Sequence, residues 1–369
     1  MINSRLVTDQ QIIANEFCRD LESTFQTDIT KYDPFGEVKF FRHLKTEEIF
    51  EMIDHAEFNY NLKNTNKKSS PGHDGITIPM IINSPLNVKD SIINLFKFSL
   101  SNSMIPDKWK TAIIIMIPKP GKDKTDLKSF RPISLLSKLL EKIINTRLTS
   151  ILESNKLISI HQSGFRKNRS TKDHILRLIQ DIKSNFNQNK LTGAVLFDVS
   201  KAFDQTWHTG ILYKMTKLNI PAYLISWVEN FLDDRKFFIQ LACHVSMYAT
   251  IKSGVPQGST ISPTLFGIYI SDIDRFELSE TVNIALYAGD ICIWYSSKHK
   301  KDITTALQKG IDYIVNYFKR WCLKINISKT AFTTAGCRKS YNRLYSLNLF
   351  IENELLKQIQ QRAMSKISI

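Results

Sequence analysis

The sequence predicts an α+β fold in which helices pack on one face of a sheet. Short runs rich in β-branched residues are interspersed with stretches whose apolar residues recur at helical spacing, and these elements do not form regular βαβ units. No period of about 20 to 50 residues recurs, so solenoids and propellers are excluded. Both observations favour one sheet-based architecture over a repeat protein or a helical bundle.

Composition and charge limit the classes of protein. The chain has 369 residues, of which 43% are hydrophobic, so it can bury a core and is neither disordered nor collagen-like. Its net charge of +15 indicates a polyanionic partner, either nucleic acid or an acidic membrane surface. The five cysteines form no C-x-x-C pair, which argues against a zinc site and fits a reducing compartment. Because no apolar stretch approaches the ~20 residues of a membrane span, we expect an intracellular protein, cytoplasmic or nuclear, that does not enter a membrane.

The elements follow in chain order. Residues 1–66 are polar with helical patches, including a helix start at 44–50, and the Ser-, Pro- and Gly-containing residues 64–72 predict a linker. Residues 111–117 are a β-branched run that Pro118 ends, which predicts a strand entering a lysine-rich loop. Apolar residues at helical spacing over 135–152, Leu136 among them, predict an amphipathic helix. Residues 194–197 predict a strand, residues 284–287 and 291–294 predict a hairpin, and a helix is expected to begin near Pro263.

Two aspartates stand at the ends of these strands. Asp198 follows a buried strand, where a carboxylate is costly unless it is paired or binds a cation; alternatively, it caps a following helix. Asp290 follows Gly289 in the hairpin, where it could serve turn geometry alone. If the hairpin tip approaches the end of the Asp198 strand, the two carboxylates form an oxygen site for Mg²⁺, which acts on phosphoryl groups.

Two loops add to this pattern. Residues 253–263 contain two glycines, two prolines and no bulky side chain before Ile261, so their backbone can approach a ligand closely, with Gln257 offering a side-chain amide beside Gly258. Lys119, Lys122 and Arg131 lie on loops after the first strand and suit a triphosphate. The alternatives are an ordinary loop and ordinary solvated surface charge.

In combination, the sequence resembles a reverse transcriptase of the non-LTR retrotransposon type, in the jockey-like LINE branch. The resemblance covers about 67–330 in ordered blocks: residues 71–76, 130–135, 161–166 with Ser170 and Thr171, 197–204, 254–263 and 321–330. It implies a right-hand polymerase with fingers and a βαββαβ palm, which copies an RNA template from a DNA primer and dNTPs. Group II intron maturases share the palm blocks, but the amino-acid sequences of residues 131–136 and 321–330 favour the retrotransposon branch.

The resemblance also implies residue roles. Asp198 and Asp290 would be catalytic carboxylates that, with the backbone carbonyl of Val199, hold the metal, two Mg²⁺ ions being expected in an intact site. Phe203 would be the steric gate that rejects a 2′-hydroxyl. The remaining nucleotide-binding residues implied are Lys119, Lys122, Arg131, Gln257, Gly258 and Lys329.

One departure bears on activity. The third palm motif of the family reads aromatic-Ala-Asp-Asp, whereas here it is Tyr287-Ala288-Gly289-Asp290, so glycine replaces the first aspartate. We therefore expect impaired polymerase activity; the alternative is a catalytically dead remnant that still binds nucleic acid. A metal-dependent phosphohydrolase would leave residues 254–263 unexplained. The expected domains are a helical or linker segment at 1–66, fingers and palm at 67–335, and a truncated polar tail at 336–369, with the thumb largely missing.

Overall fold

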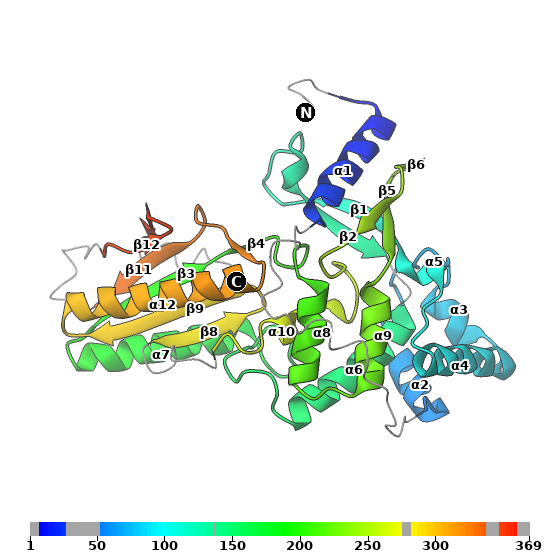
Figure 1. The fold of residues 1–369 in the computed structure, drawn as a ribbon, viewed down its shortest axis with the longest axis horizontal. Coiled ribbons are helices and arrows are strands. Elements are labelled where there is room, and N and C mark those ends of the chain that lie inside the picture. Colours follow the sequence, from blue (N-terminus) through cyan, green and yellow to red (C-terminus); the bar gives the residue numbers. More distant parts are fainter. Residues whose placement is uncertain (1–6, 27–51, 136–137, 275–281, 337–346, 360–369) are drawn as a thin grey trace. The chain divides into compact units, whose positions relative to one another are not determined.

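The chain folds into two compact units, shown in Figure 1. The computed structural model describes residues 7–26, 52–135, 138–274, 282–336 and 347–359. The first unit comprises Met1–Asn155 and Phe203–Phe266, and the second comprises Lys156–Ala202 and Gly267–Ile369. The boundaries expected from the sequence, after residues 66 and 335, do not coincide with these units. The helix start expected at 44–50 lies outside the described residues.

The first unit is built around a mixed sheet in the order β2-β1-β5-β6, with β7 also paired to β5. The strands are β1 (Thr111–Pro118), β2 (Phe130–Leu135), β5 (Arg235–Leu241), β6 (His244–Val245) and β7 (Ala249–Ile251). Helix α1 (Gln10–Thr24) begins after Asp9, whose carboxylate accepts hydrogen bonds from two backbone N–H groups of the first turn. Its Phe17 and Leu21 pack with Ile114 and Phe237 of the sheet in one buried cluster.

Seven further helices belong to the described part of the first unit. They are α2 (His55–Lys63), α3 (Ile78–Asn83), α4 (Leu86–Ser101), α5 (Asp107–Lys110), α6 (Lys138–Ser154), α8 (His208–Lys217) and α9 (Ala222–Leu232). Helix α2 is fixed to α6 by the ion pair of Arg147 with Glu57, at 2.6 Å. Helix α4 is fixed to α9 by a hydrogen bond from Trp227 Nε1 to Ser99 Oγ, at 3.2 Å.

The strand predicted at 111–117 is confirmed as β1, but the prediction of a helix from residue 135 is wrong at its start. Leu135 is the last residue of β2 and pairs with Ile113 of β1, so tertiary pairing overrides the apolar spacing there. The helix itself begins at Lys138, and Leu136 lies outside the described residues.

The second unit contains a five-stranded sheet in the order β14-β11-β3-β9-β8. Its strands are β3 (Leu191–Phe197), β8 (Asn283–Tyr287), β9 (Asp290–Ser297), β11 (Ala331–Ala335) and β14 (Lys357–Gln358). Helix α10 (Ser262–Tyr269) begins in the first unit and ends in the second, and α12 (Lys300–Arg320) follows β9. The chain order β3-α10-β8-β9-α12-β11 is βαββαβ, with all pairs among these four strands antiparallel. The predicted α+β class, palm order, hairpin and helix start near Pro263 are thereby confirmed.

Shorter strands complete the second unit. Strand β4 (Val199–Ser200) pairs with β10 (Lys324–Ile325), and β12 (Phe350–Ile351) pairs with β13 (Glu354–Leu355). Strand β4 directly follows Asp198 in the chain, and its pairing with β10 places it beside the segment that leads to Lys329. It therefore shapes the end of the sheet at which the two aspartates lie.

Helices cover both faces of this sheet, not one face as the sequence predicted. Helix α12 lies against one face, because a Cβ added at Gly193 would stand 2.7 Å from Ile303 and 2.8 Å from Leu307. Helix α7 (Thr171–Asn187) lies against the other face, where its Asp181 accepts a hydrogen bond from Trp294 Nε1 at 3.0 Å. Most residues of β3 are buried in an unbroken run, as expected for a strand covered on both sides.

Candidate active site

Asp198 lies directly after the last residue of β3 and is held through its backbone. Its N–H donates to Thr330 Oγ1 at 3.3 Å, and its carbonyl oxygen accepts from the N–H of Asn326 at 2.7 Å. These bonds leave its carboxylate, which is about one-third exposed, free to point into the pocket. The alternative that Asp198 caps a following helix is wrong, because strand β4 follows Asp198 and the next helix along the chain, α8, begins only at His208.

Asp290 stands beside Asp198 at the same end of the sheet. The β3–β9 register pairs Phe197 with Ile291, which places the residue after one strand next to the first residue of the other. Asp290 is exposed at the hairpin tip, yet partial desolvation of its carboxylate raises its pKa, and the negative charge of Asp198 raises that pKa further. Two carboxylates are thus brought together, as expected from the hairpin.

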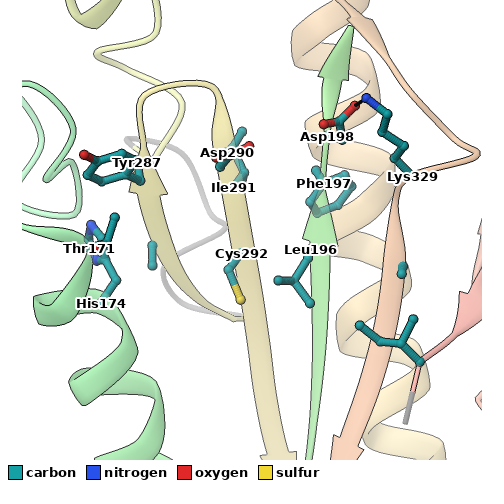
Figure 2. A pocket seen from close by; sticks show the side chains of 13 residues that line it. Thr171, His174, Leu196, Phe197, Asp198, Tyr287, Asp290, Ile291, Cys292 and Lys329 are labelled. Atoms are coloured by element: carbon teal, nitrogen blue, oxygen red, sulfur yellow. Dashed lines mark ion pairs between the residues drawn. The ribbon is translucent and has the colours of Figure 1, made fainter. Parts of the chain in front are cut away.

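Lys329 supplies the positive charge of this site. Its ammonium nitrogen lies 3.5 Å from Oδ2 of Asp198, and its side chain is 67% exposed. A dashed line in Figure 2 marks this ion pair. Lys329 also lowers the pKa of Asp290, against the two effects that raise it. Because the ammonium is exposed, it can move between the carboxylate and a bound anion at little cost.

A pocket of about 420 Å³ lies over these residues on the α7 side of the sheet (Figure 2). Besides the two aspartates and Lys329, it is lined by Thr171 and His174 of α7 and by Leu196, Tyr287 and Cys292 of the sheet. Burial raises the pKa of the Cys292 thiol to about 12, so it is a neutral wall of the pocket at pH 7. Thr171 belongs to one of the sequence blocks that carry the family resemblance. No local sequence pattern pointed to His174 or Cys292 as residues of the site.

The donor set suits a hard divalent cation. Mg²⁺ is commonly bound by one or two carboxylates together with substrate phosphates, and Asp198 with Asp290 supplies two carboxylates. In the described ranges, no group of three or more His, Cys, Asp or Glu residues is arranged so that it could hold a metal ion. Gly289, between Ala288 and Asp290, contributes no side chain. The residues present therefore fit one cation held jointly with a substrate, but they do not make a complete two-ion site.

In the first unit, residues 253–261 form a loop held by hydrogen bonds, and α10 begins directly after it. Gln257 Nε2 donates to Oδ1 of Asp204 at 2.7 Å, while the Gln257 carbonyl accepts from Ser134 N–H at 2.6 Å. Gly258 has φ +103° and a Cβ there would stand 2.7 Å from the Ser134 carbonyl oxygen, so only glycine fits without strain. The backbone at Gly258 packs closely against β2, and the amide of Gln257 faces Asp204. The close approach of this loop to a ligand stays a prediction.

The cationic residues predicted after β1 are placed as follows. The prediction that Arg131 lies on a loop is wrong, because Arg131 is exposed on strand β2, where it pairs with Ile117 of β1. Lys122 is exposed in the loop between these strands. Lys119 donates from Nζ to the carbonyl oxygen of Lys128 at 2.6 Å. Their roles toward a triphosphate stay predictions, as does the backbone ligand predicted at Val199, which pairs with Ile325.

Phe203, the predicted steric gate, belongs to the first unit. Its ring stacks on that of Phe266, with centroids 4.8 Å apart and an interplanar angle of 20°. Its carbonyl oxygen accepts from Val255 N–H at 2.7 Å, which joins the segment after β4 to the glycine-containing loop.

Sequence reasoning missed two residues that form hydrogen bonds to the loop at residues 253–261. Glu141 of α6 is 4% exposed, and its Oε2 accepts from Ser259 Oγ at 2.5 Å and from Thr260 N–H at 3.1 Å. His208 Nε2 donates to the Gly254 carbonyl at 2.7 Å. The sequence did contain a signal that Glu141 is buried. It lies three residues before Ile144 and seven before Leu148, on the apolar stripe of its helix. His208 had none.

Most of the chain is similar to known proteins. Residues 117–363 match the family model described as reverse transcriptase (RNA-dependent DNA polymerase). The probable RNA-directed DNA polymerase from transposon BS of Drosophila melanogaster is 32% identical over 295 residues, covering 78% of this chain and 32% of that protein. The RNA-directed DNA polymerase from mobile element jockey of the same organism is 34% identical over 290 residues, covering 76% and 31%. The chain thus spans about a third of the length of these curated relatives.

Among solved structures, apo telomerase from Candida tropicalis, truncated from its C-terminal domain, aligns with a TM-score of 0.46 at 12% identity. The alignment covers 68% of this chain and 55% of that one. Within the ranges that the structure describes, no helix combines the length and apolar character that a membrane crossing needs.

Proposed function

This chain belongs to the reverse transcriptase family, in its non-LTR retrotransposon branch, and we propose that its site performs RNA-directed DNA synthesis. The observation that supports this most is the position of Asp198 beside Asp290 at the ends of adjacent antiparallel strands, over an open pocket. The substrates would be a primer 3′-hydroxyl, a dNTP and an RNA template. The reaction forms a bond from the primer oxygen to the α-phosphorus and breaks the bond to pyrophosphate.

The three charged residues of the pocket have separate tasks in this proposal. Asp198 and Asp290 would hold the divalent cation, which supplies charge neutralisation at the phosphoryl centre when bound. Lys329 would leave Asp198 and pair with the phosphates of the incoming nucleotide. Partial desolvation first, and then the negative charge of Asp198, raise the pKa of Asp290, and a cation bound beside both carboxylates would favour its charged form.

The first unit would supply the nucleotide-binding residues. Arg131 lies on the exposed face of the β1–β2 hairpin beside Ile117, which is 48% exposed, so cationic and apolar surface are presented together. We assign Arg131, Lys119 and Lys122 to the triphosphate. Phe203 is assigned to the 2′ position of the sugar, and the backbone of Gly258, with Gln257, to the nucleotide and template. The chain's net charge of +15 suits a template-primer.

Gly289 would impair this activity. The family's first aspartate of the hairpin contributes a carboxylate that Gly289 cannot, and each ~1.4 kcal/mol of lost transition-state stabilisation costs tenfold in rate. A second candidate follows from the same observation, namely a remnant that binds nucleic acid without extending a primer. Lys119, Lys122 and Arg131 are independent of residue 289, which favours retained binding in either case.

Primer extension on an RNA template separates these candidates. The chain and its Gly289→Asp variant are compared with Mg²⁺ and with Mn²⁺, and we expect extension to rise about a hundredfold or more in the variant. Asp198→Asn in the Gly289→Asp background should abolish extension, whereas Glu354→Gln, at an exposed position of the same unit, should leave it unchanged. No extension by Gly289→Asp, together with salt-dependent binding of an RNA/DNA hybrid, would establish the remnant instead.

A further inference from the structure

Residues 161–166 pair with the hairpin that carries Asp290. Gln162 forms a bridge with Leu286 of β8 in which Leu286 N–H donates to the His161 carbonyl and Ser163 N–H donates to the Leu286 carbonyl, both at 2.9 Å. This segment therefore lies along the outer edge of β8 as a short parallel partner. The sequence resemblance included it among its ordered blocks and gave it no task at the hairpin.

The side chain of Gln162 reaches past β8 to the turn itself. Its Oε1 accepts from the N–H of Ala288 at 3.1 Å and from the N–H of Gly164 at 2.7 Å, and its Nε2 donates to the Ala288 carbonyl at 3.4 Å. The residue is 3% exposed. Both backbone polar groups of Ala288 are thus satisfied by one buried amide, which is the pattern of a clamp on that peptide.

Ala288 needs such a clamp. Its φ of +53° lies in the left-handed region, which costs a residue with a Cβ about 1 kcal/mol or more. Its neighbour Gly289 is the least restrained residue type, so the turn itself does little to fix the direction in which residue 289 and Asp290 leave it. Gly164 completes the arrangement, since a Cβ there would stand 2.2 Å from the Ala288 nitrogen.

We propose that Gln162 is a positioning residue that fixes the hairpin turn and thereby the placement of position 289 and of Asp290 over the pocket. The inference rests on the proposed function for its catalytic consequence but not for its structural one. Gln162 touches neither Asp290 nor Asp198 in any contact of the described residues. It acts through Ala288.

Backbone hydrogen exchange tests the structural part. In Gln162→Leu we expect peptides covering 284–290 to exchange about tenfold faster, while peptides covering 303–318 of α12 stay as protected as before. Gln308→Leu is the matched control, because Gln308 brackets the N–H and the carbonyl of Phe350 in the same way, both at 2.9 Å, in the same unit. Gln162→Glu keeps the acceptor and loses the donor, so its hairpin should exchange at an intermediate rate.

Two results would overturn the proposal. One is exchange at 284–290 that Gln162→Leu does not change. The other is exchange raised equally throughout the second unit, which would make Gln162 an ordinary core residue. If Gln162→Leu does not fold, Gln162→Met, which is unbranched and of similar length, takes its place. Failure of both to fold while Gln308→Leu folds would also overturn it, because Gln162 would then hold the unit and not the turn.

Steady-state primer extension in the Gly289→Asp background tests the catalytic part. Gln162→Leu should lower kcat about tenfold with little change in KM for the template-primer, and Gln162→Glu should recover part of that loss. Gln308→Leu should leave both constants unchanged. An equal loss in Gln308→Leu would contradict a specific role. If Gly289→Asp itself extends no primer, the proposed function fails while the exchange result still decides the role of Gln162.

Discussion

Gln257 donates a hydrogen bond from Nε2 to Oδ1 of Asp204 over 2.7 Å, and Asp204 is 7% exposed. The glycine-containing loop is thereby tied to the segment that follows β4 by a charge-assisted hydrogen bond. Val255 N–H adds a backbone bond to the Phe203 carbonyl at 2.7 Å. The conformation of the loop and that of the Phe203 segment are therefore set together.

Replacing Gln257 by Leu should destabilise the first unit by about 1–3 kcal/mol, because the buried Asp204 carboxylate loses a donor. Urea unfolding followed by circular dichroism measures the loss. Gln240→Leu, at an exposed position of β5 in the same unit, should change stability by less than about 0.5 kcal/mol. Equal stability of Gln257→Leu and the parent would show that the bond contributes nothing.

Replacing Glu141 by Ala should cost about 1–3 kcal/mol, because the change leaves the buried Ser259 hydroxyl and the Thr260 N–H without their acceptor. Arg235 is fully buried, and burial lowers its pKa to about 10 although Glu141 raises it. Glu141→Gln should cost less, since its side-chain oxygen can still accept from the loop. Thermal and urea unfolding would measure both, with Glu153→Ala, exposed on the same helix, as the control.

The pH dependence of stability should carry a contribution from His208. Desolvation lowers its pKa to about 4, from the ordinary value of 6.5, so the unfolded chain binds a proton before the folded chain does. The contribution of His208 to the free energy of unfolding is complete above pH 6.5 and is lost as the pH falls toward 4. At pH 5.5 the loss amounts to about 1 kcal/mol. Urea unfolding at pH 7.5 and 5.5 should show this difference.

His208→Gln keeps a donor for the Gly254 carbonyl and cannot titrate. The part of the pH dependence that belongs to His208 should therefore disappear in this variant, while the contributions of other groups remain in both proteins. If the difference in unfolding free energy between the parent and His208→Gln is the same at pH 7.5 and pH 5.5, the assignment to His208 is contradicted.

Lys329→Met should leave stability within about 0.5 kcal/mol of the parent, because its ion pair with Asp198 is largely exposed. If the ammonium pairs with nucleotide phosphates, the same change in the Gly289→Asp background should raise KM for dNTP about tenfold. Lys357→Met, exposed on β14 of the same unit, is the control in steady-state extension. An unchanged KM would remove Lys329 from the nucleotide site.

Local sequence signals predicted the parts of the fold that local chemistry decides. The β-branched run ending at Pro118, the apolar run before Asp198 and the alternation around Gly289 each predicted a strand or hairpin that the structure contains. The approach of Asp290 to Asp198 was also anticipated, because both stand at strand ends.

The remaining features depend on contacts between distant residues. Leu135 joins a strand because β1 offers it a partner, and α7 covers the second face of the sheet through Asp181 and Trp294. Gln162 could be recognised as part of a block, but its bonds to Ala288 connect residues far apart in the chain. A charged residue on an apolar helix stripe, as at Glu141, is the sequence signal that would have found one such contact.

The interleaving of the two units sets an order for folding during synthesis. Residues 203–266 of the first unit are inserted between β3 and β8, and β3 pairs Leu196 with Ala331, far along the chain. A nascent chain can therefore complete the first unit while β3 still lacks both of its neighbours. During that interval β3 presents two unpaired edges, and the face that α12 later covers is still open, so the second unit is the slower to form and the more prone to aggregate on the ribosome.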